Sequence, residues 1–358
     1  MKRREFVSKI GVVAGATAVS GSSVASASEK KFRWKMATTW PPRTAILQEA
    51  ADRFVKMVKE ASGGRLSIKV FAGGELIPAL GVFDAVSQGN IEMGIGSPYY
   101  WAGKSQAAQF FGSMPFGMNA QQFNAWMVAG GGQQLWEEVY APFGLVPFQF
   151  GNTGCQCGGW FKKEIKSAES LKGLKFRAPG LGGKVMAKAG ANVVLMPGSE
   201  VYTALERGTV DGAEWISPYH DEKLGLHRAA KFYYYPGWQE PSSNLELTVS
   251  KKAWDTLPKD LQAIVRHATM DCMIWTLCRS EAENGAALER LKSKYKVKVQ
   301  PFPEDVLNTL RKHRDEVIQE LVSKDPISAK VEESYRKFSE EIQTWSKISE
   351  LAYASARG

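Results

Sequence analysis

The sequence has few of the residues and motifs on which most enzyme active sites depend. Its 358 residues include only four cysteines and four histidines. The serine-hydrolase pattern G-x-S-x-G, the zinc-protease pattern H-E-x-x-H and the phosphate-binding Walker loop are all absent. The histidines are scattered, at positions 220, 227, 267 and 313. These absences favour a binding protein over an enzyme.

The four cysteines are also too awkwardly spaced for a disulfide framework. Cys155 and Cys157 are separated by one residue, and so short a spacing strains a direct bridge. Cys272 and Cys278 lie six residues apart in a segment with helical periodicity, so they fall on different faces. No C-x-x-C pair is present, which also disfavours a zinc site.

Neither a long apolar run nor a basic block follows the first 27 residues. No later stretch has 18 uninterrupted apolar residues, so we expect a soluble mature protein without direct membrane insertion. The formal net charge is +9, of which residues 1–27 carry +3 and the remainder +6. Because acidic residues separate the basic ones, we interpret this charge as a solubility property and expect no nucleic-acid partner.

Residues 1–27 have the pattern of an export signal. A charged start is followed by a short apolar run from Ile10 to Val19 and by the small residues Ala25-Ser26-Ala27, which suit signal cleavage. The pair Arg3-Arg4 is typical of twin-arginine export. The alternative is an ordinary secretory signal that happens to contain two arginines. Either signal predicts a periplasmic protein.

The first part of the mature chain alternates between strand and helix patterns. Strands are predicted at Lys31–Thr39, Leu66–Phe71 and Ile91–Gly96, and helices at Thr44–Ala61 and Leu80–Gln88. This β-α-β-α-β order predicts a parallel sheet covered by helices. Since the whole chain is too long for one ordinary core, we expect residues 28–150 to form mainly a first α/β lobe.

A similar but looser pattern follows, and we expect residues 151–250 to form mainly a second lobe. Its predicted elements are strands at Gly144–Phe150, Gly158–Phe161, Leu174–Arg177, Asn192–Met196 and Val210–Ile216, and helices at Gly182–Ala189 and Val201–Arg207. Ligands of such sheets bind beyond the carboxyl ends of the strands. The pattern therefore predicts a cleft between two lobes.

Long helical patterns fill the rest of the chain. Helices are predicted at Pro258–Ala287 and Pro303–Ser323, within a segment 251–326 that completes the lobes. A third helix is predicted at Ile327–Ala354, within residues 327–358, and carries a strong apolar stripe. The stripe either packs on its own chain or faces a second subunit in a homodimer.

Charged residues at predicted strand ends are the candidates for ligand binding. Arg177 ends a strand just before a Pro-Gly turn, and its planar fork suits a carboxylate; the alternative is a surface arginine or an internal ion pair. Glu214 stands at another strand end, and Glu240 follows an aromatic run. Such acids are costly to bury without a partner, which an oxygen-seeking cation could supply. Their alternative is exposure in loops.

Several segments resemble the solute-binding subunits of tripartite ATP-independent periplasmic (TRAP) transporters. They are E-L-I-P at 75–78, D-A-V-S-Q-G at 84–89, G-L-K-F-R at 173–177 and A-L-E-R-G-T-V-D-G at 204–212. The likeness covers nearly the whole mature chain. It implies an α/β, two-lobed periplasmic binding protein-like fold with a cleft between the lobes and long C-terminal helices. It also implies membrane partners, the integral subunits of such a transporter.

A narrower resemblance is to the 2-oxo acid and lactate binders of that family. It rests on G-N-T-G at 151–154, G-G-W-F at 158–161, E-W at 214–215, P-Y at 218–219, D-E-K-L-G at 221–225 and residues 233–238. It implies that Arg177 binds the ligand carboxylate and that Gln156 touches ligand and cation. The implied ligand-binding residues are Gln156, Arg177, Trp215, Glu240, Asn152 and Tyr100, and the implied cation ligands are Gln156, Glu214, Trp215 through its carbonyl, and Glu240.

Charge counting supports the cation independently of the resemblance. Glu214, Glu240 and a ligand carboxylate bring three negative charges, and Arg177 brings one positive charge. The remaining excess of two negative charges would be repulsive in a closed cleft. Calcium would neutralise it, and sodium would leave one negative charge. A 2-oxo or 2-hydroxy acid suits such a site because its carboxylate and adjacent oxygen can chelate one ion.

Three alternatives remain open from the sequence. The ligand could be lactate or another carboxylate rather than a 2-oxo acid such as pyruvate. The partner could be a sensor kinase instead of a transporter. An exported enzyme is the third alternative, since twin-arginine export often carries prefolded enzymes, but no cofactor motif or nucleophile–base pair supports it.

Overall fold

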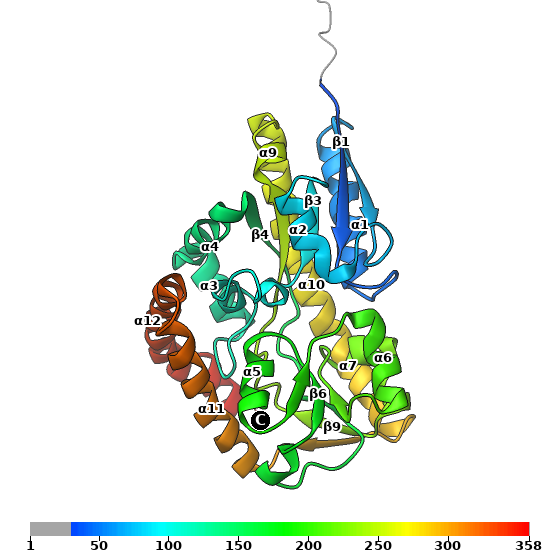
Figure 1. Ribbon diagram of the computed structural model, residues 1–358, viewed down its shortest axis with the longest axis vertical. Coiled ribbons are helices and arrows are strands. Elements are labelled where there is room, and N and C mark those ends of the chain that lie inside the picture. The colour runs from blue at the N-terminus through cyan, green and yellow to red at the C-terminus, as the bar shows by residue number, and fades with distance from the viewer. Residues whose placement is uncertain (1–29, 358) are drawn as a thin grey trace, which may run out of the picture. The chain divides into compact units, whose positions relative to one another are not determined.

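Two β-sheets organise residues 30–357, which are the residues that the computed structural model describes. The predicted export signal at residues 1–27 lies outside them. We call the part of the chain around the five-stranded sheet lobe I and the part around the six-stranded sheet lobe II. In Figure 1, lobe I lies in the upper half of the view and lobe II in the lower half.

The sheet of lobe I has the strand order β2-β1-β3-β10-β4. Its strands are β1 (Phe32–Thr38), β2 (Leu66–Phe71), β3 (Met93–Gly96), β4 (Leu145–Asn152) and β10 (Asn244–Ser250). In β1, the alternating Phe32, Trp34 and Met36 are buried while the residues between them are exposed, because successive side chains point to opposite faces. The first three strands run parallel, as the sequence pattern predicts.

Strand β10, which the sequence pattern did not predict, makes the complete sheet mixed rather than parallel. This strand runs antiparallel to both β3 and β4, between which it is inserted. All of its residues are buried, so it lacks the apolar-polar alternation that reveals a half-exposed strand. Its place also means that part of the range 151–250, expected mainly in the second lobe, belongs to lobe I.

The sheet of lobe II has the strand order β11-β9-β5-β8-β6-β7. The strands are short: β5 (Gly159–Phe161), β6 (Lys175–Arg177), β7 (Asn192–Val194), β8 (Gly212–Ala213), β9 (Phe232–Tyr235) and β11 (Lys298–Pro301). β6 pairs in parallel with both β7 and β8. The predicted strand Val210–Ile216 is therefore confirmed only at its centre, and the residues after it turn into the region between the lobes.

Helices cover both sheets. They are α1 (Leu47–Ala61), α2 (Val82–Ser87), α3 (Ala120–Ala129), α4 (Gly132–Tyr140), α5 (Gly180–Lys188), α6 (Gly198–Arg207), α7 (Pro218–Leu224), α8 (Leu226–Ala229), α9 (Lys251–Trp254), α10 (Lys259–Ser293), α11 (Glu304–Val322), α12 (Pro326–Ile348) and α13 (Glu350–Arg357). The sequence reading missed α3 and α4, whose Gly-rich junction masks their periodicity.

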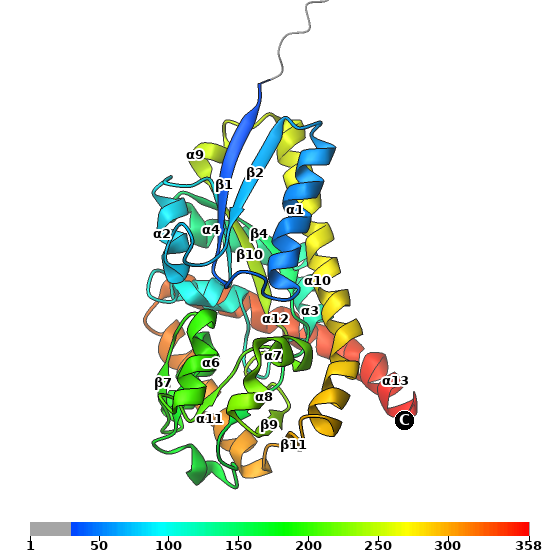
Figure 2. The ribbon, with the colours of Figure 1, turned by 90° about the vertical axis from the view of Figure 1, so that its right-hand side faces the viewer.

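Three links carry the chain from one sheet to the other: β4–β5, β9–β10 and α10–β11. Helix α10 contacts α1 and β4 of lobe I and α7 of lobe II, and Figure 2 shows it running beside both lobes. Buried apolar side chains form two clusters, and each includes residues from both sheets. The described residues from Lys31 onward accordingly form one compact unit.

The predicted C-terminal helix Ile327–Ala354 is two helices rather than one. Ser349, at φ −113° and ψ −99°, interrupts it between α12 and α13. The apolar stripe divides in the same region. Val331 and Tyr335 are buried against the chain itself, whereas Trp345 is 60% and Ile348 74% exposed. The stripe thus packs on its own chain in its first part and is exposed in its last part.

Two further observations concern residues 30–357 as a whole. No helix in this range combines the length and the apolar character needed to cross a bilayer. Cys155, Cys157, Cys272 and Cys278 are all free thiols.

Candidate functional site

The strands of lobe II bring Arg177 and Glu214 together. Residues Phe176 and Arg177 of β6 pair in parallel with Gly212 and Ala213 of β8. Parallel neighbours end at the same edge of a sheet, so the last residue of β6 and the residue after β8 become adjacent. The Glu214 backbone N–H donates to the Arg177 carbonyl oxygen at 3.0 Å.

Arg177 is buried at this edge with only part of its guanidinium engaged. Its side chain is 1% exposed. Nη1 donates to the Glu214 carbonyl oxygen at 2.8 Å and to Glu214 Oε2 at 3.0 Å. The guanidinium carbon lies 5.5 Å from the centre of the Trp215 ring. Nε and Nη2 have no hydrogen-bond partner among the described residues, so two fork donors remain available.

The two links between the lobes supply the other polar groups. Gln156 lies in the link from β4 to β5, and Glu240 lies in the link from β9 to β10. The links are joined by a hydrogen bond from the Gln156 backbone N–H to the Glu240 carbonyl oxygen at 3.1 Å. The Gln156 amide nitrogen donates to Thr153 Oγ1 at 3.1 Å. Its Oε1 is buried without a partner in the part of the chain that the structure describes.

A small enclosed cavity of about 20 Å³ lies where these elements meet. A volume of this size holds about one water molecule, so the lobes are closely apposed around it. Its lining combines lobe I, lobe II and the links: Trp40, Leu47, Ser97, Tyr99, Tyr100, Thr153, Gln156, Arg177, Trp215, Ile216, Ser243 and Leu245.

The two glutamates of the site lie in an environment that disfavours their charged forms. Burial raises the pKa of Glu214 well above its ordinary value, and the nearby Glu240 raises it further, while Arg177 lowers it. Burial also raises the pKa of Glu240 to about 7, against hydrogen bonding from Ser243 and the charge of Arg177. One arginine therefore does not offset two buried carboxylates, and a further positive charge would stabilise both.

The predicted site residues do not all reach the cavity. Gln156, Arg177, Trp215 and Tyr100 line it, and Glu214 and Glu240 contact lining residues. Asn152 is buried, but its side-chain oxygen accepts from the Gly154 backbone N–H at 2.9 Å and its amide nitrogen donates to Asn124 at 3.3 Å. Ligand contact by Asn152 stays a prediction, and the present geometry gives its amide a role in shaping the β4–β5 link.

Sequence reasoning missed Tyr99, Thr153 and Ser243 as parts of the site. The Tyr99 hydroxyl lies 3.2 Å from Ser243 Oγ and donates to Glu240 Oε2 at 3.4 Å. Burial raises the pKa of Tyr99 well above its usual value, so the hydroxyl stays protonated and available as a donor. The signal in the sequence was proximity, since Tyr99 and Thr153 are next to the predicted site residues Tyr100 and Asn152, and Ser243 is three residues after Glu240.

The residues present fit an oxygen-seeking cation. No group of three or more His, Cys, Asp or Glu side chains between residues 30 and 357 is arranged to hold a metal. The candidate donors are instead mixed: Oε1 atoms of Gln156 and Glu214 that are buried and without partners in the described chain, together with Glu240. Carboxylate and amide oxygens are the ligands that hard cations such as calcium take. The donor set therefore favours sodium or calcium over a soft transition metal.

The chain is similar in sequence to bacterial solute-binding proteins. The profile described as DctP, bacterial extracellular solute-binding protein, family 7, matches residues 36–325. A monocarboxylate 2-oxoacid-binding periplasmic protein from a Nostoc species is 44% identical over 358 residues, which cover 99% of this chain and 98% of the relative.

Two solved structures resemble the fold over more than nine tenths of the chain. A TRAP solute-binding protein from Pseudoalteromonas atlantica, with bound sodium and pyruvate, is 43% identical with a TM-score of 0.89, covering 91% of this chain and 99% of the other. One from Bordetella bronchiseptica, a dimer with calcium and picolinate bound at one active site and none at the other, is 38% identical with a TM-score of 0.90, covering 92% and 97%.

Proposed function

Because the chain belongs to family 7 of the bacterial extracellular solute-binding proteins, the DctP family of TRAP transporters, we propose that it captures a small 2-oxo monocarboxylate such as pyruvate as a complex with a cation. Membership of a binding-protein family agrees with the expectation that the chain is not an enzyme. The pyruvate bound by the Pseudoalteromonas relative supports the ligand class.

One observation carries this proposal: four unpartnered buried atoms belong to Gln156 and Arg177, which line one cavity, and to Glu214, which is hydrogen-bonded to Arg177. Arg177 Nε and Nη2 are donors, and Gln156 Oε1 and Glu214 Oε1 are acceptors, and none has a hydrogen-bond partner within residues 30–357. A buried polar atom without a partner costs about 1–3 kcal/mol, so four in one place indicate a missing complement. An anion satisfies the two donors, and a cation satisfies the two acceptors.

The chain's residues divide the work of binding. Arg177 presents its two free fork donors to the ligand carboxylate, and a planar guanidinium matches that group in bidentate geometry. Nη1 remains fixed to Glu214, which keeps the fork oriented. The Trp215 ring beside the guanidinium excludes water from that face. The cation supplies the positive charge that the two glutamates require.

Some residues of the site would contact both the cation and the ligand. Gln156, Glu214 and Glu240 would hold the ion, with the Trp215 carbonyl as a further donor. Sodium in the Pseudoalteromonas relative and calcium in the Bordetella relative support either ion. A 2-oxo acid can chelate one ion through a carboxylate oxygen and the adjacent oxo oxygen. Picolinate can chelate an ion through a carboxylate oxygen and the adjacent ring nitrogen.

Titration calorimetry tests the proposal directly. The mature protein is chelated exhaustively and titrated with pyruvate, lactate and a longer 2-oxo acid, each with sodium or calcium restored. We expect tight binding of the 2-oxo acids only when a cation is present. Preferred binding of lactate would move the assignment to 2-hydroxy acids. Binding of none of the three, with or without ions, would overturn the ligand class.

Delivery to a membrane transporter follows from the family rather than from the site. We expect export to the periplasm, with residues 1–27 removed as a twin-arginine signal, and docking on the integral TRAP subunits. A sensor kinase as partner is the alternative. Transport of labelled pyruvate into vesicles that contain the membrane subunits, dependent on the added binding protein, separates the two.

The exposed end of the C-terminal stripe supports a homodimer. Trp345, Ile348, Leu351 and Tyr353 are 58–74% exposed on α12 and α13, and the Bordetella relative is a dimer. Large apolar side chains gathered on one exposed segment are typical of subunit contacts. Light scattering should give twice the chain mass, and replacement of Trp345 and Ile348 by Ser should shift it toward the monomer. A monomer at high concentration would contradict the proposal.

A further inference from the structure

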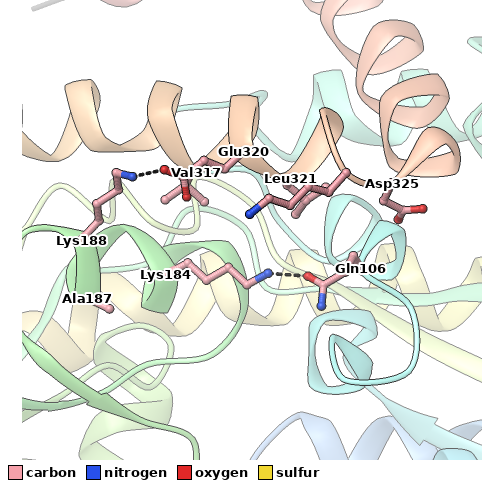
Figure 3. A pocket seen from close by; sticks show the side chains of 9 residues that line it. Gln106, Lys184, Ala187, Lys188, Val317, Glu320, Leu321 and Asp325 are labelled. Carbon is pink, nitrogen blue, oxygen red and sulfur yellow. Dashed lines mark hydrogen bonds and ion pairs between the residues drawn. The ribbon is translucent and has the colours of Figure 1, made fainter.

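Helix α5 and residues 98–106 are the parts of the two lobes that meet beside the site. α5 begins three residues after Arg177, and residues 98–106 follow β3 of lobe I. Figure 3 shows the outer end of this contact, a pocket of about 600 Å³ to which α5, α11 and Gln106 contribute. The Lys184 amine points across it and donates to the Gln106 side-chain oxygen.

At the inner end of the contact, Gly180 lies against Tyr99 with no room for a side chain. A Cβ atom at position 180 would be 2.8 Å from Tyr99 Cβ and 3.2 Å from its Cγ. Gly112 of lobe I packs equally closely on the ring, since a Cβ at position 112 would be 2.6 Å from Tyr99 Cδ1. Tyr99 therefore contacts a glycine of lobe I and a glycine of lobe II, and neither position has room for a side chain.

The position of Tyr99 matters because its hydroxyl reaches the site. It contacts Ser243 and Glu240, at 3.2 and 3.4 Å, and Tyr99 lines the cavity. Gly180 and Lys184 are four residues apart on α5, so they share one face of the helix. Both residues meet the same lobe I segment, at Tyr99 and Gln106 respectively. One face of α5 thus contacts lobe I at two places, at Tyr99 beside the cavity and at Gln106 in the outer pocket.

We infer that this face of α5 is the closing contact of the two lobes, and that Gly180 sets how closely they approach. The inference rests on the proposed function and adds to it that the lobes open to admit the ligand and close around it. A contact made only in the closed form changes the open–closed equilibrium and hence the apparent affinity. Gly180 and Lys184 then determine affinity without touching the ligand.

The test compares two glycine-to-alanine substitutions that share a backbone cost. Gly180 has φ +57° and Gly173 has φ +71°, so an alanine at either position is strained in the left-handed region. A Cβ at Gly173 meets no atom of residues 30–357 within 4 Å. Gly180→Ala and Gly173→Ala should therefore lose similar thermal stability, and only Gly180→Ala should oppose closure.

The measurements are calorimetry and stopped-flow binding of pyruvate with calcium or sodium, and small-angle scattering with and without the ligand. We expect Gly180→Ala to raise Kd at least about tenfold through faster dissociation, with incomplete ligand-induced contraction. Gly173→Ala should bind as the wild type does. Lys184→Met, which keeps the helix and removes the tether to Gln106, should raise the dissociation rate severalfold.

The outcomes separate this inference from the proposed function. A wild type that binds and contracts, with Gly180→Ala and Lys184→Met matching Gly173→Ala, would overturn the closing role of α5 alone. A wild type that binds none of the carboxylates, under any ionic condition, would overturn the proposed function and with it the role in affinity. Selective weakening in Gly180→Ala supports both.

Discussion

The buried carboxylates Asp221 and Glu214 differ in how completely their hydrogen bonds are made. Asp221 is 1% exposed and accepts from Trp160 Nε1 at 2.8 Å, from the Tyr233 hydroxyl at 2.8 Å and from the Ile216 backbone N–H at 3.0 Å. Glu214 is equally buried, but its Oε1 has no partner in the described chain. The first cluster is complete within the protein, and the second is not.

The difference shows which polar clusters hold the fold and which await a ligand. Burial raises the pKa of Asp221 to about 6, although hydrogen bonds from Trp160, Tyr233 and the backbone of Ile216 and Ser217 lower it. Burial also raises the pKa of Glu214 well above its ordinary value, and the second-largest cause of that rise is another carboxylate, Glu240. A satisfied buried acid stabilises the elements that it joins. An unsatisfied pair of acids beside a half-engaged arginine costs stability until a cation and an anion bind.

The largest effect should come from removing the arginine of the incomplete cluster. Arg177→Met should weaken pyruvate binding by about 2–5 kcal/mol, or about thirtyfold to several-thousandfold, because a buried charge pair loses one partner. Calorimetry measures it, and Arg33→Met, at an exposed position of β1, is the control. Unchanged affinity in Arg177→Met would show that the carboxylate is bound elsewhere.

The complete cluster should respond in stability instead. Asp221→Ala leaves the donors of Trp160, Tyr233 and Ile216 without their acceptor, so the free energy of unfolding should fall by on the order of 3 kcal/mol. Urea denaturation measures the loss. In Asp255→Ala, which removes an exposed pair with Lys251, the change should stay within about 1 kcal/mol. Equal losses in the two variants would mean that the Asp221 cluster contributes no more than a surface ion pair.

The sequence could predict the lobe II half of the site because local rules govern it. Arg177 ends β6 and Glu214 follows β8, and these strands pair in parallel. Parallel strands that end at the same edge bring the residues at their carboxyl ends together. Gln156 and Glu240 could not be placed in this way. They meet because β10 returns to lobe I between β3 and β4, a crossing that no local pattern encodes. Their joint role came from the family resemblance.

The sequence also did not predict the part played by Tyr99 or the break in the C-terminal helix, and the physical reason is again long-range packing. Tyr99 reaches the site because Gly112 and Gly180, 68 residues apart in the chain, leave room for its ring. The break at Ser349 divides a helix whose periodicity continues across it, so pattern alone predicts one helix. Long-range packing and single backbone dihedrals are set by the folded chain as a whole, whereas periodicity reports only neighbours.

A third buried acid extends the comparison to pH. Glu246 is complete, since it accepts from Trp101 Nε1 and, at 2.8 Å, from the Tyr140 hydroxyl, and burial raises its pKa to about 7. Because the folded pKa lies above the unfolded value, this residue makes stability fall as the pH rises from about 4.5 to about 7.

Glu246→Gln should remove that part of the pH dependence. The shift corresponds to an upper value of about 3 kcal/mol, and we expect about 2 kcal/mol less loss of unfolding free energy in the variant between pH 5 and pH 8. The amide can accept from Trp101 and donate to the Tyr140 oxygen, so the cluster stays closed. Denaturation curves at both pH values measure the effect, and parallel losses in variant and wild type would contradict it.

The smallest effect should come from a substitution of Gln156. Unlike a substitution in a complete cluster, it should change cation binding and leave stability nearly unchanged. Gln156→Leu removes an acceptor that has no partner in the described chain together with the side-chain bond to Thr153, so the unliganded protein should keep its stability within about 1 kcal/mol. Its half-saturating cation concentration, measured by calorimetry at fixed pyruvate, should rise about tenfold.

Gln149→Leu is the matched control, because the Gln149 amide already donates to Asn124 and Asn244. That variant should lose stability and keep its cation affinity. If Gln156→Leu instead lost stability and bound the cation normally, Gln156 would belong with the complete clusters, and the cation would rest on the glutamates alone.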